Sequence, residues 1–220
     1  MIQKLIDAEL LKEQDSRKGR KGSGKWKPSM LGRCYRAHYW ARKGEEQTNP
    51  PDIRTLRVFK VGKLFHEFVQ GYLPEKCTEV EVNDENVYGF ADIVGQDTVY
   101  DIKSQHSRAF WYMKKDGYDV KKEKYTNWLQ VMCYAKMLGK KKGCLMFVSK
   151  DDLCVEEYVD FTENWEEELT KEFTTLNAIW EQDILPAPEP RAYSGKECTY
   201  CNFKDKCKEE DGHKEAEPNR

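Results

Sequence analysis

The 220-residue sequence has no apolar run that approaches the roughly 20 residues needed to span a bilayer. Its first residues, MIQKLIDAELLKEQDS, are amphipathic and lack the basic start and apolar centre of a secretory leader. We therefore expect a cytoplasmic chain with no membrane association. Internal repeats and long low-complexity linkers are also absent. With 35% charged and 39% apolar residues, the composition is that of a globular chain with a real core, most simply one domain.

Acidic residues are missing from one long stretch. The segment from Arg17 to Lys43 contains ten Lys or Arg and no Asp or Glu, although the whole chain carries a net charge of -2. Aromatic residues interleave with these cations, a mixture that suits a nucleic-acid backbone with unstacked bases. For residues 17–25, a solvated flexible arm is an equally good interpretation. The DNA-binding residues that we expect are Lys25, Trp26, Lys27, Arg33 and Arg36.

Eight cysteines need an explanation in a reducing compartment, where structural disulfides are rare. The stretch CTYCNFKDKC supplies Cys198, Cys201 and Cys207, one ligand short of a four-thiolate site, and Cys34 is the natural fourth. Such a site would join the two ends of the chain, and zinc is the general candidate for it. The other cysteines fall within apolar stretches and are interpreted as small core residues: Cys77, Cys133, Cys144 and Cys154.

Hydrophobic periodicity and turn residues predict an alternation of helices and strands. Helices are expected at 1–15, 29–43, 56–73, 125–138 and 163–183. Strands are expected at 78–83, 87–94, 98–103, 144–149 and 154–161. An irregular, aromatic-rich stretch is expected around 110–118. This order of elements predicts an α/β domain with a mixed sheet.

The stretch YGFADIVGQDTVYDIKSQ places charged residues where a strand pair would normally carry apolar ones. Gly95-Gln96-Asp97 predicts a short turn between two strands. Asp101 and Lys103 are two positions apart and share one face, and Asp92 on the partner strand can reach the same patch. Two neighbouring carboxylates repel unless a cation lies between them, which favours a divalent metal. A hairpin with one polar face in water is the plainer alternative.

Polar residues on two predicted helices could complete this site. His66 follows Gly62 by four positions and so lies one turn along the same helix face. An isolated helical histidine is more often structural, but an imidazole with two carboxylates suits Mn²⁺, or Mg²⁺ with more bound water. Gln130 and Tyr134 lie four apart on the helix after the hairpin. They face either solvent or a polar cleft.

Taken together, these motifs resemble the iron-sulfur RecB-type nucleases of the PD-(D/E)xK superfamily. That group includes the CRISPR-associated 4Fe-4S exonucleases and the AddB-type helicase-nuclease subunits. The motifs are, in order, Cys34, Gly62-x-x-x-His66, Gly89-x-x-Asp92, Asp101-Ile102-Lys103, Gln130-x-x-x-Tyr134 and the three late cysteines. The resemblance covers about 34–207. One departure is that Asp101 stands where many relatives have Glu, which leaves the metal preference open.

The resemblance implies a restriction-endonuclease-like core with a mixed central sheet flanked by helices. It also implies a 4Fe-4S cluster on Cys34, Cys198, Cys201 and Cys207, in a lobe formed by about 29–45 and 195–207. The expected organisation is a helix and basic arm at 1–28, a nuclease domain at 29–207 and a polar tail at 208–220.

Roles for the site residues follow from the same resemblance. Mg²⁺ or Mn²⁺ would be held by His66, Asp92, Asp101 and the Ile102 carbonyl. Lys103 would orient the attacking water, Gln130 would position the nucleophile or Lys103, and Tyr134 would brace the DNA backbone.

The implied activity is hydrolysis of DNA by an exonuclease, on single strands from the 5′ end, with endonuclease activity as a further expectation. Protein partners in recombination or CRISPR adaptation are also expected. A non-catalytic DNA-binding module, stapled by iron-sulfur or zinc, is the alternative. A redox iron-sulfur protein is a weaker one, because it leaves the His, Asp and Lys residues unexplained.

Overall fold

The computed structural model describes residues 1–16 and 22–211. Arg17, Lys18, Arg20 and Lys21 of the expected basic arm lie outside the described residues, as does most of the expected polar tail. The described α-helices are α1 Ile2–Asp15, α2 Tyr35–Lys43, α3 Ile53–Gln70, α4 Ser107–Met113, α5 Val120–Glu123, α6 Tyr125–Met137, α7 Glu166–Gln182 and α8 Lys204–Glu210. Short 3₁₀ segments are η1 Pro28–Met30, η2 Glu75–Cys77, η3 Thr162–Trp165, η4 Tyr193–Gly195 and η5 Glu197–Tyr200.

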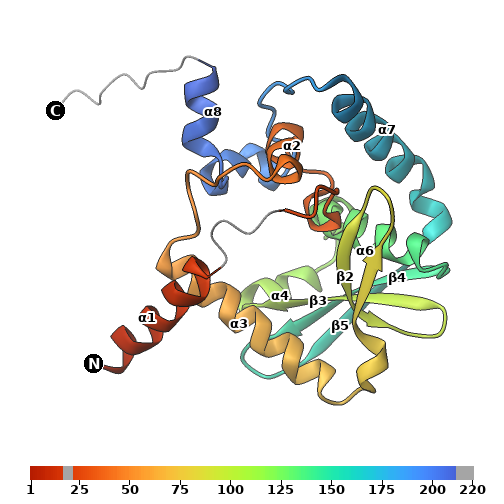
Figure 1. The fold of residues 1–220 in the computed structure, drawn as a ribbon. Helices are drawn as coiled ribbons and strands as arrows, with labels where there is room; N and C mark the ends of the chain where they lie inside the picture. The colour runs from red at the N-terminus through yellow and green to blue at the C-terminus, as the bar shows by residue number, and fades with distance from the viewer. Residues whose placement is uncertain (17–21, 212–220) are drawn as a thin grey trace.

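The strands form one five-stranded sheet in the order β1-β2-β3-β4-β5. They are β1 Thr78–Asn83, β2 Tyr88–Val94, β3 Thr98–Gln105, β4 Lys142–Ser149 and β5 Val155–Phe161. β3 and β4 are parallel, and the other neighbours are antiparallel. A parallel pair needs a long crossover, which the segment from α4 to α6 supplies. The predicted α/β fold, with a mixed central sheet flanked by helices, is confirmed (Figure 1).

The main core lies between the sheet and α6. Leu129 and Met132 of α6 are completely buried, together with Leu145 and Phe147 of β4. Full burial of one such side chain stabilises a fold by about 1.5–3 kcal/mol. The helix approaches β4 so closely that a Cβ on Gly143 would lie 2.8 Å from the Met132 sulfur. A glycine is therefore required where the helix crosses the strand.

The opposite face of the sheet is only partly covered, by α3. Ile93, Ile102 and Val148 form a small cluster there, against which Phe65 and Val69 of α3 pack. The helix begins at Asp52, whose side chain accepts a hydrogen bond from the Thr55 N–H. The apolar residues whose periodicity predicts this helix are mostly exposed, because a different face of the helix packs against the sheet. Phe59, Leu64, Phe68 and Leu73 all point at least partly to solvent.

One predicted helix start and one stretch expected to be irregular are wrong. The second helix begins at Tyr35 and not at 29, because η1 and a left-handed Gly32 (φ 73°) redirect the chain first. It ends at the left-handed Gly44 as expected. The stretch expected to be irregular contains α4 and α5, each begun by a residue whose side chain accepts a backbone N–H. Among the described residues, no helix is both long and apolar enough to cross a membrane.

Candidate active site

The sheet divides where the predicted catalytic residues lie. β2 pairs with β3 only at Ile93–Tyr100 and Val94–Val99, and beyond them β2 stays with β1 while β3 stays with β4. Asp92 and Asp101 are the next positions past the last pair. The Asp92 carboxylate accepts the Ile102 N–H at 2.7 Å and so takes the place of a strand carbonyl. We call this divergence the fork.

The Asp92 carboxyl lies in surroundings that disfavour its charge. Burial raises its pKa to about 7, and the nearby Asp101 charge adds to the effect. His66 projects from α3 with its Nδ1 3.6 Å from Asp92 Oδ1. Burial lowers the pKa of His66, helped by the Lys103 charge, so the ring is a neutral donor at pH 7. A cation placed between these two groups would be favoured by both.

Glu79 joins this pair, and sequence reasoning missed it. Three ligand atoms lie within 4.8 Å of one another, one each from His66, Glu79 and Asp92. Glu79 has a left-handed backbone (φ 47°), which is rare for a residue other than glycine and concentrates at functional sites. The Gln70 amide donates to Glu79 Oε1 at 2.8 Å and to the Asp92 carbonyl at 2.9 Å, which fixes the two acids together.

Only the presence of an acid on a predicted strand pointed to Glu79. Glu81, two positions later on the same strand, has the same signal, and its carboxylate accepts from the Asn83 amide instead. The positions of the acids along β1 therefore could not show which of the two belongs to the site.

Asp101 and Lys103 form the other half of the site, on β3. The Lys103 ammonium lies 2.7 Å from each carboxylate oxygen of Asp101. Its hydrogen bond goes to Oδ1, and Oδ2 stays buried without a hydrogen-bond partner. Asp101 does not belong to the close group of ligand atoms, but its charge acts on both His66 and Asp92. The Ile102 backbone acts on the His66 ring as well, where it partly opposes the lowering of the His66 pKa by burial.

Tyr134 of α6 lies under the fork, where it explains one predicted motif. A Cβ on Gly89 would lie 2.4 Å from the Tyr134 hydroxyl, so only glycine fits there. Burial raises the pKa of Tyr134 above its ordinary value, so the phenol stays neutral. Gln130, one turn earlier, is half-buried, and no described residue forms a hydrogen bond with its amide.

The donor set at the fork fits a hard divalent cation. Mn²⁺ accepts the donors found here, which are an imidazole, two carboxylates with close ligand atoms and a third acid nearby. Mg²⁺ accepts the carboxylate oxygens of the same set. Asp92 has a raised pKa, and Asp101 Oδ2 is buried without a hydrogen bond, so each carboxylate would gain from a nearby cation. These residues therefore fit a metal of that class.

Three of the four expected cluster cysteines, Cys34, Cys201 and Cys207, share one apolar cluster. This cluster includes residues of α2, which lies with α8 away from the sheet (Figure 1). Burial raises the pKa of Cys201, and the negative charges of the other three cysteines raise it further. Such an effect requires short distances, so the four side chains lie near one another. No three of these sulfurs lie within 4.8 Å of one another. A tetrahedral zinc with 2.3 Å bonds needs sulfurs about 3.8 Å apart. The sulfurs therefore do not form a close group of three ligand atoms like that of His66, Glu79 and Asp92.

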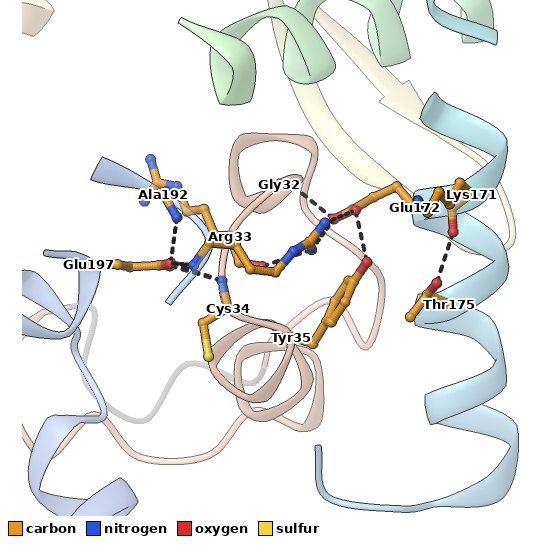
Figure 2. A network of polar contacts seen from close by, with 10 residues as sticks. Gly32, Arg33, Cys34, Tyr35, Lys171, Glu172, Thr175, Ala192 and Glu197 are labelled. Atoms are coloured by element: carbon orange, nitrogen blue, oxygen red, sulfur yellow. Dashed lines mark hydrogen bonds and ion pairs between the residues drawn. The ribbon is translucent and has the colours of Figure 1, made fainter. Parts of the chain in front are cut away.

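A buried carboxylate fixes the first cysteine against the last segment of the chain. The Glu197 side chain accepts hydrogen bonds from the backbone N–H groups of Cys34, Arg191 and Ala192 (Figure 2). Arg36, on α2, lies 3.5 Å from the Cys207 sulfur and donates to it. These contacts join the two chain ends without any metal.

A second buried carboxylate, Glu172 of α7, supports the loop before Cys34. It accepts the Gly32 N–H at 2.8 Å and the Tyr35 hydroxyl at 3.0 Å (Figure 2). Arg191 binds both of its oxygens and also donates to the Arg33 carbonyl. A bidentate guanidinium is the strong way to neutralise a buried carboxylate.

Two of the residues expected to contact DNA have side chains that face inward. Trp26 is 0% exposed, and its indole N–H donates to Asn177. Arg36 is 6% exposed and donates to the Pro186 carbonyl and to Asp211, besides the Cys207 sulfur. The cationic and aromatic pattern of this segment therefore serves packing as well as charge.

The other three expected contacts keep some exposure. Lys27 is exposed, and Arg33 is half-exposed with its guanidinium 5.4 Å from the Tyr193 ring centroid. Lys25 is half-buried and donates to Asn83 and to the Asp84 carbonyl.

The remaining cysteines are core residues only in part. Cys133 and Cys144 are buried as expected, and Cys77 is half-buried. Cys154 is exposed, which contradicts its assignment to the core. It lies just before β5, where the edge strand leaves the turn.

Comparison with known proteins places the fold. No family model matches the chain, and no curated protein matches it. Among solved structures, SSO0001 has a TM-score of 0.59 with 20% sequence identity, over 94% of this chain and 96% of that one. An alkaline exonuclease from Laribacter hongkongensis, alone and in complex with dAMP, has a TM-score of 0.49 with 15% identity, over 73% of this chain and 89% of that one. The likeness to SSO0001 is one of fold.

Proposed function

We propose that the protein is a metal-dependent deoxyribonuclease, an exonuclease that hydrolyses single-stranded DNA from the 5′ end. The observation that carries this proposal is the fork. It combines a close group of His66, Glu79 and Asp92 with a buried Asp101–Lys103 pair on the adjoining strand. Acidic metal ligands beside a lysine suit phosphodiester hydrolysis, because a bound cation and an ammonium can together stabilise the charge that develops on the phosphate.

The metal, Mg²⁺ or Mn²⁺, would be held by His66, Glu79, Asp92 and Asp101, with the Ile102 carbonyl adjoining. When bound, such an ion polarises the scissile phosphate and lowers the pKa of a bound water. Gln70 holds Glu79 and the Asp92 backbone in place for this role. Asp92 contributes its carboxylate oxygen not committed to the Ile102 N–H.

The remaining side chains would act on the nucleophile and the DNA. Lys103 keeps its ammonium beside Asp101, where it can orient the attacking water and offset charge on the phosphorane. Gln130 has a free amide with which to position that water or Lys103. Tyr134 stays neutral and braces the backbone from beneath the fork. The proposed 4Fe-4S cluster on the four cysteines would be structural, tying the two ends of the chain.

The test is cleavage of single strands labelled at either end, with and without Mn²⁺. We expect hydrolysis that needs the metal and releases the 5′ label first. Asp92→Ala and Lys103→Ala should each lose activity by about two orders of magnitude or more while keeping the fold, because each removes a preorganised group. Lys141→Ala is the matched control, since Lys141 is exposed at the opposite end of the sheet.

Wild-type activity in either site variant would refute the assignment of the fork. Metal-dependent binding of DNA without any cleavage would instead support the alternative, a non-catalytic module stapled by iron-sulfur or zinc. Release of the 3′ label first would keep the nuclease and reverse its polarity.

A further inference from the structure

The fork opens toward a surface that the site residues do not use. β2 and β3 are antiparallel, so the end at which they diverge is the end where β2 begins and β3 finishes. β3 finishes at Gln105, and α4 starts two residues later (Figure 1). From Lys103 to the start of α4 is four residues, about 13 Å of extended chain. The outer face of α4 therefore lies next to the mouth of the fork.

Two aromatic rings on α4 point to solvent. Phe110 and Met113 hold the helix to the core with 1% and 5% exposure, while Trp111 and Tyr112 are 49% and 56% exposed. Trp111 is the one exposed tryptophan of six, since the other five are buried or half-buried.

Basic residues surround these rings. Between His106 and Lys124 the chain carries six Lys or Arg and three Asp or Glu. The Lys114 ammonium lies 4.8 Å from the Trp111 ring centroid, and that of Lys115 lies 5.3 Å from the Tyr112 centroid. Lys114 is also paired with Glu156. Lys115 and the exposed Arg108 have no ion pair among the described residues.

We propose that the outer face of α4 is a base-stacking platform for single-stranded DNA at the mouth of the fork, with Trp111 and Tyr112 stacking on bases and Arg108 and Lys115 contacting phosphates. This rests on the proposed nuclease function and names how its substrate is held. Flat rings flanked by cations match an unstacked, anionic strand. A duplex hides the faces of its bases, and an apolar protein partner would bury the lysines at a cost. The platform also continues directly from the catalytic strand.

The test measures binding separately from cleavage. The full chain is titrated with a short oligo-dT in EDTA, where hydrolysis is stopped, and tryptophan fluorescence is followed. We expect quenching that saturates with binding and disappears in Trp111→Phe, because the other tryptophans are shielded. Trp111→Ala/Tyr112→Ala should bind about tenfold more weakly or worse, since both rings that would stack on bases are lost. Arg108→Ala/Lys115→Ala should lower the slope of log affinity against log salt by up to about 0.7 for each contact.

Tyr200→Ala is the matched control, because Tyr200 is 74% exposed but lies in the cysteine lobe. The melting temperature of each variant confirms that it folds. Unchanged affinity for oligo-dT in Trp111→Ala/Tyr112→Ala would overturn the platform even if the enzyme cuts DNA. Failure of the wild type to bind oligo-dT would overturn it too. So would an equal loss of affinity for duplex DNA in the same variant. If the wild type never cuts DNA but the variant still binds oligo-dT more weakly, the platform is supported and the nuclease is refuted.

Discussion

The backbone N–H of Cys34 donates to both carboxylate oxygens of Glu197, at 3.0 and 3.1 Å, across 163 positions of sequence. Glu197 directly precedes Cys198, the second of the four converging cysteines. One buried side chain therefore fixes the separation of two thiols that come from opposite ends of the chain.

Replacement of Glu197 should loosen this junction. In Glu197→Gln, an amide NH₂ takes the place of one oxygen and faces backbone N–H groups that need an acceptor. A buried donor left without a partner costs about 1–3 kcal/mol. We expect a fall of that size in the free energy of unfolding, measured with denaturant, and lower metal content in the purified protein. Glu189→Gln, at an exposed position nearby, should change neither. Full stability in Glu197→Gln would show that the clamp is dispensable.

The four-thiol site should carry iron. Protein purified without oxygen should be brown, with about four irons per chain, because a cubane cluster on four thiolates contains four irons and absorbs visible light. Cys34→Ser or Cys207→Ser should lose the colour and much of the solubility, since cluster binding is coupled to folding. Cys154→Ser, at an exposed site, is the control and should keep both. Colourless protein with one zinc per chain would refute the cluster and leave the nuclease untouched.

Glu79 should contribute to metal affinity. Glu79→Gln removes the charge of one of three close ligands but keeps a side chain that Gln70 can still contact. We expect Mn²⁺ to bind at least about tenfold more weakly, the loss usually seen when a metal site loses even an outer partner. Titration of metal-free protein, followed by calorimetry, measures it. Glu81→Gln, on the same strand, is the control, and equal losses in both variants would mean a general charge effect.

His38 should make the fold sensitive to acid. Its ring is completely buried, accepts the Lys27 N–H at 3.1 Å, and has its pKa lowered to about 3 by burial and by nearby cations. The unfolded chain binds a proton near pH 6.5, whereas the folded chain does not until about pH 3. The free energy of unfolding should therefore fall by up to about 1.4 kcal/mol for each pH unit below 6.5.

Urea unfolding between pH 4 and 7 measures this dependence. His38→Gln keeps an acceptor for Lys27 but does not titrate, so the part of the slope due to His38 should vanish. An unchanged slope in that variant would assign the acid sensitivity to carboxylates elsewhere.

The sequence determined most of the elements because each has a local cause. The helices at α3, α6 and α7 follow from periodicity, and the left-handed Gly44 and Gly139 follow from the need for a residue without Cβ at those turns. The β2–β3 hairpin and the placing of Asp92, Asp101 and Lys103 follow from the alternation of strand faces. These rules need no knowledge of distant residues.

Only the tertiary structure decided which of these residues face one another and which face water. Trp26 and Arg36 carry the pattern of a nucleic-acid arm, yet they are buried against Asn177 and Asp211, residues about 150 or more positions away. Glu79 differs from Glu81 in its left-handed backbone and in the hydrogen bond that its carboxylate accepts from Gln70 of α3. Trp111 and Tyr112 became visible as surface rings only when Phe110 and Met113 took the inner face of α4. Local sequence fixes backbone conformation, but burial and ligand distances depend on contacts between segments that are remote in the chain.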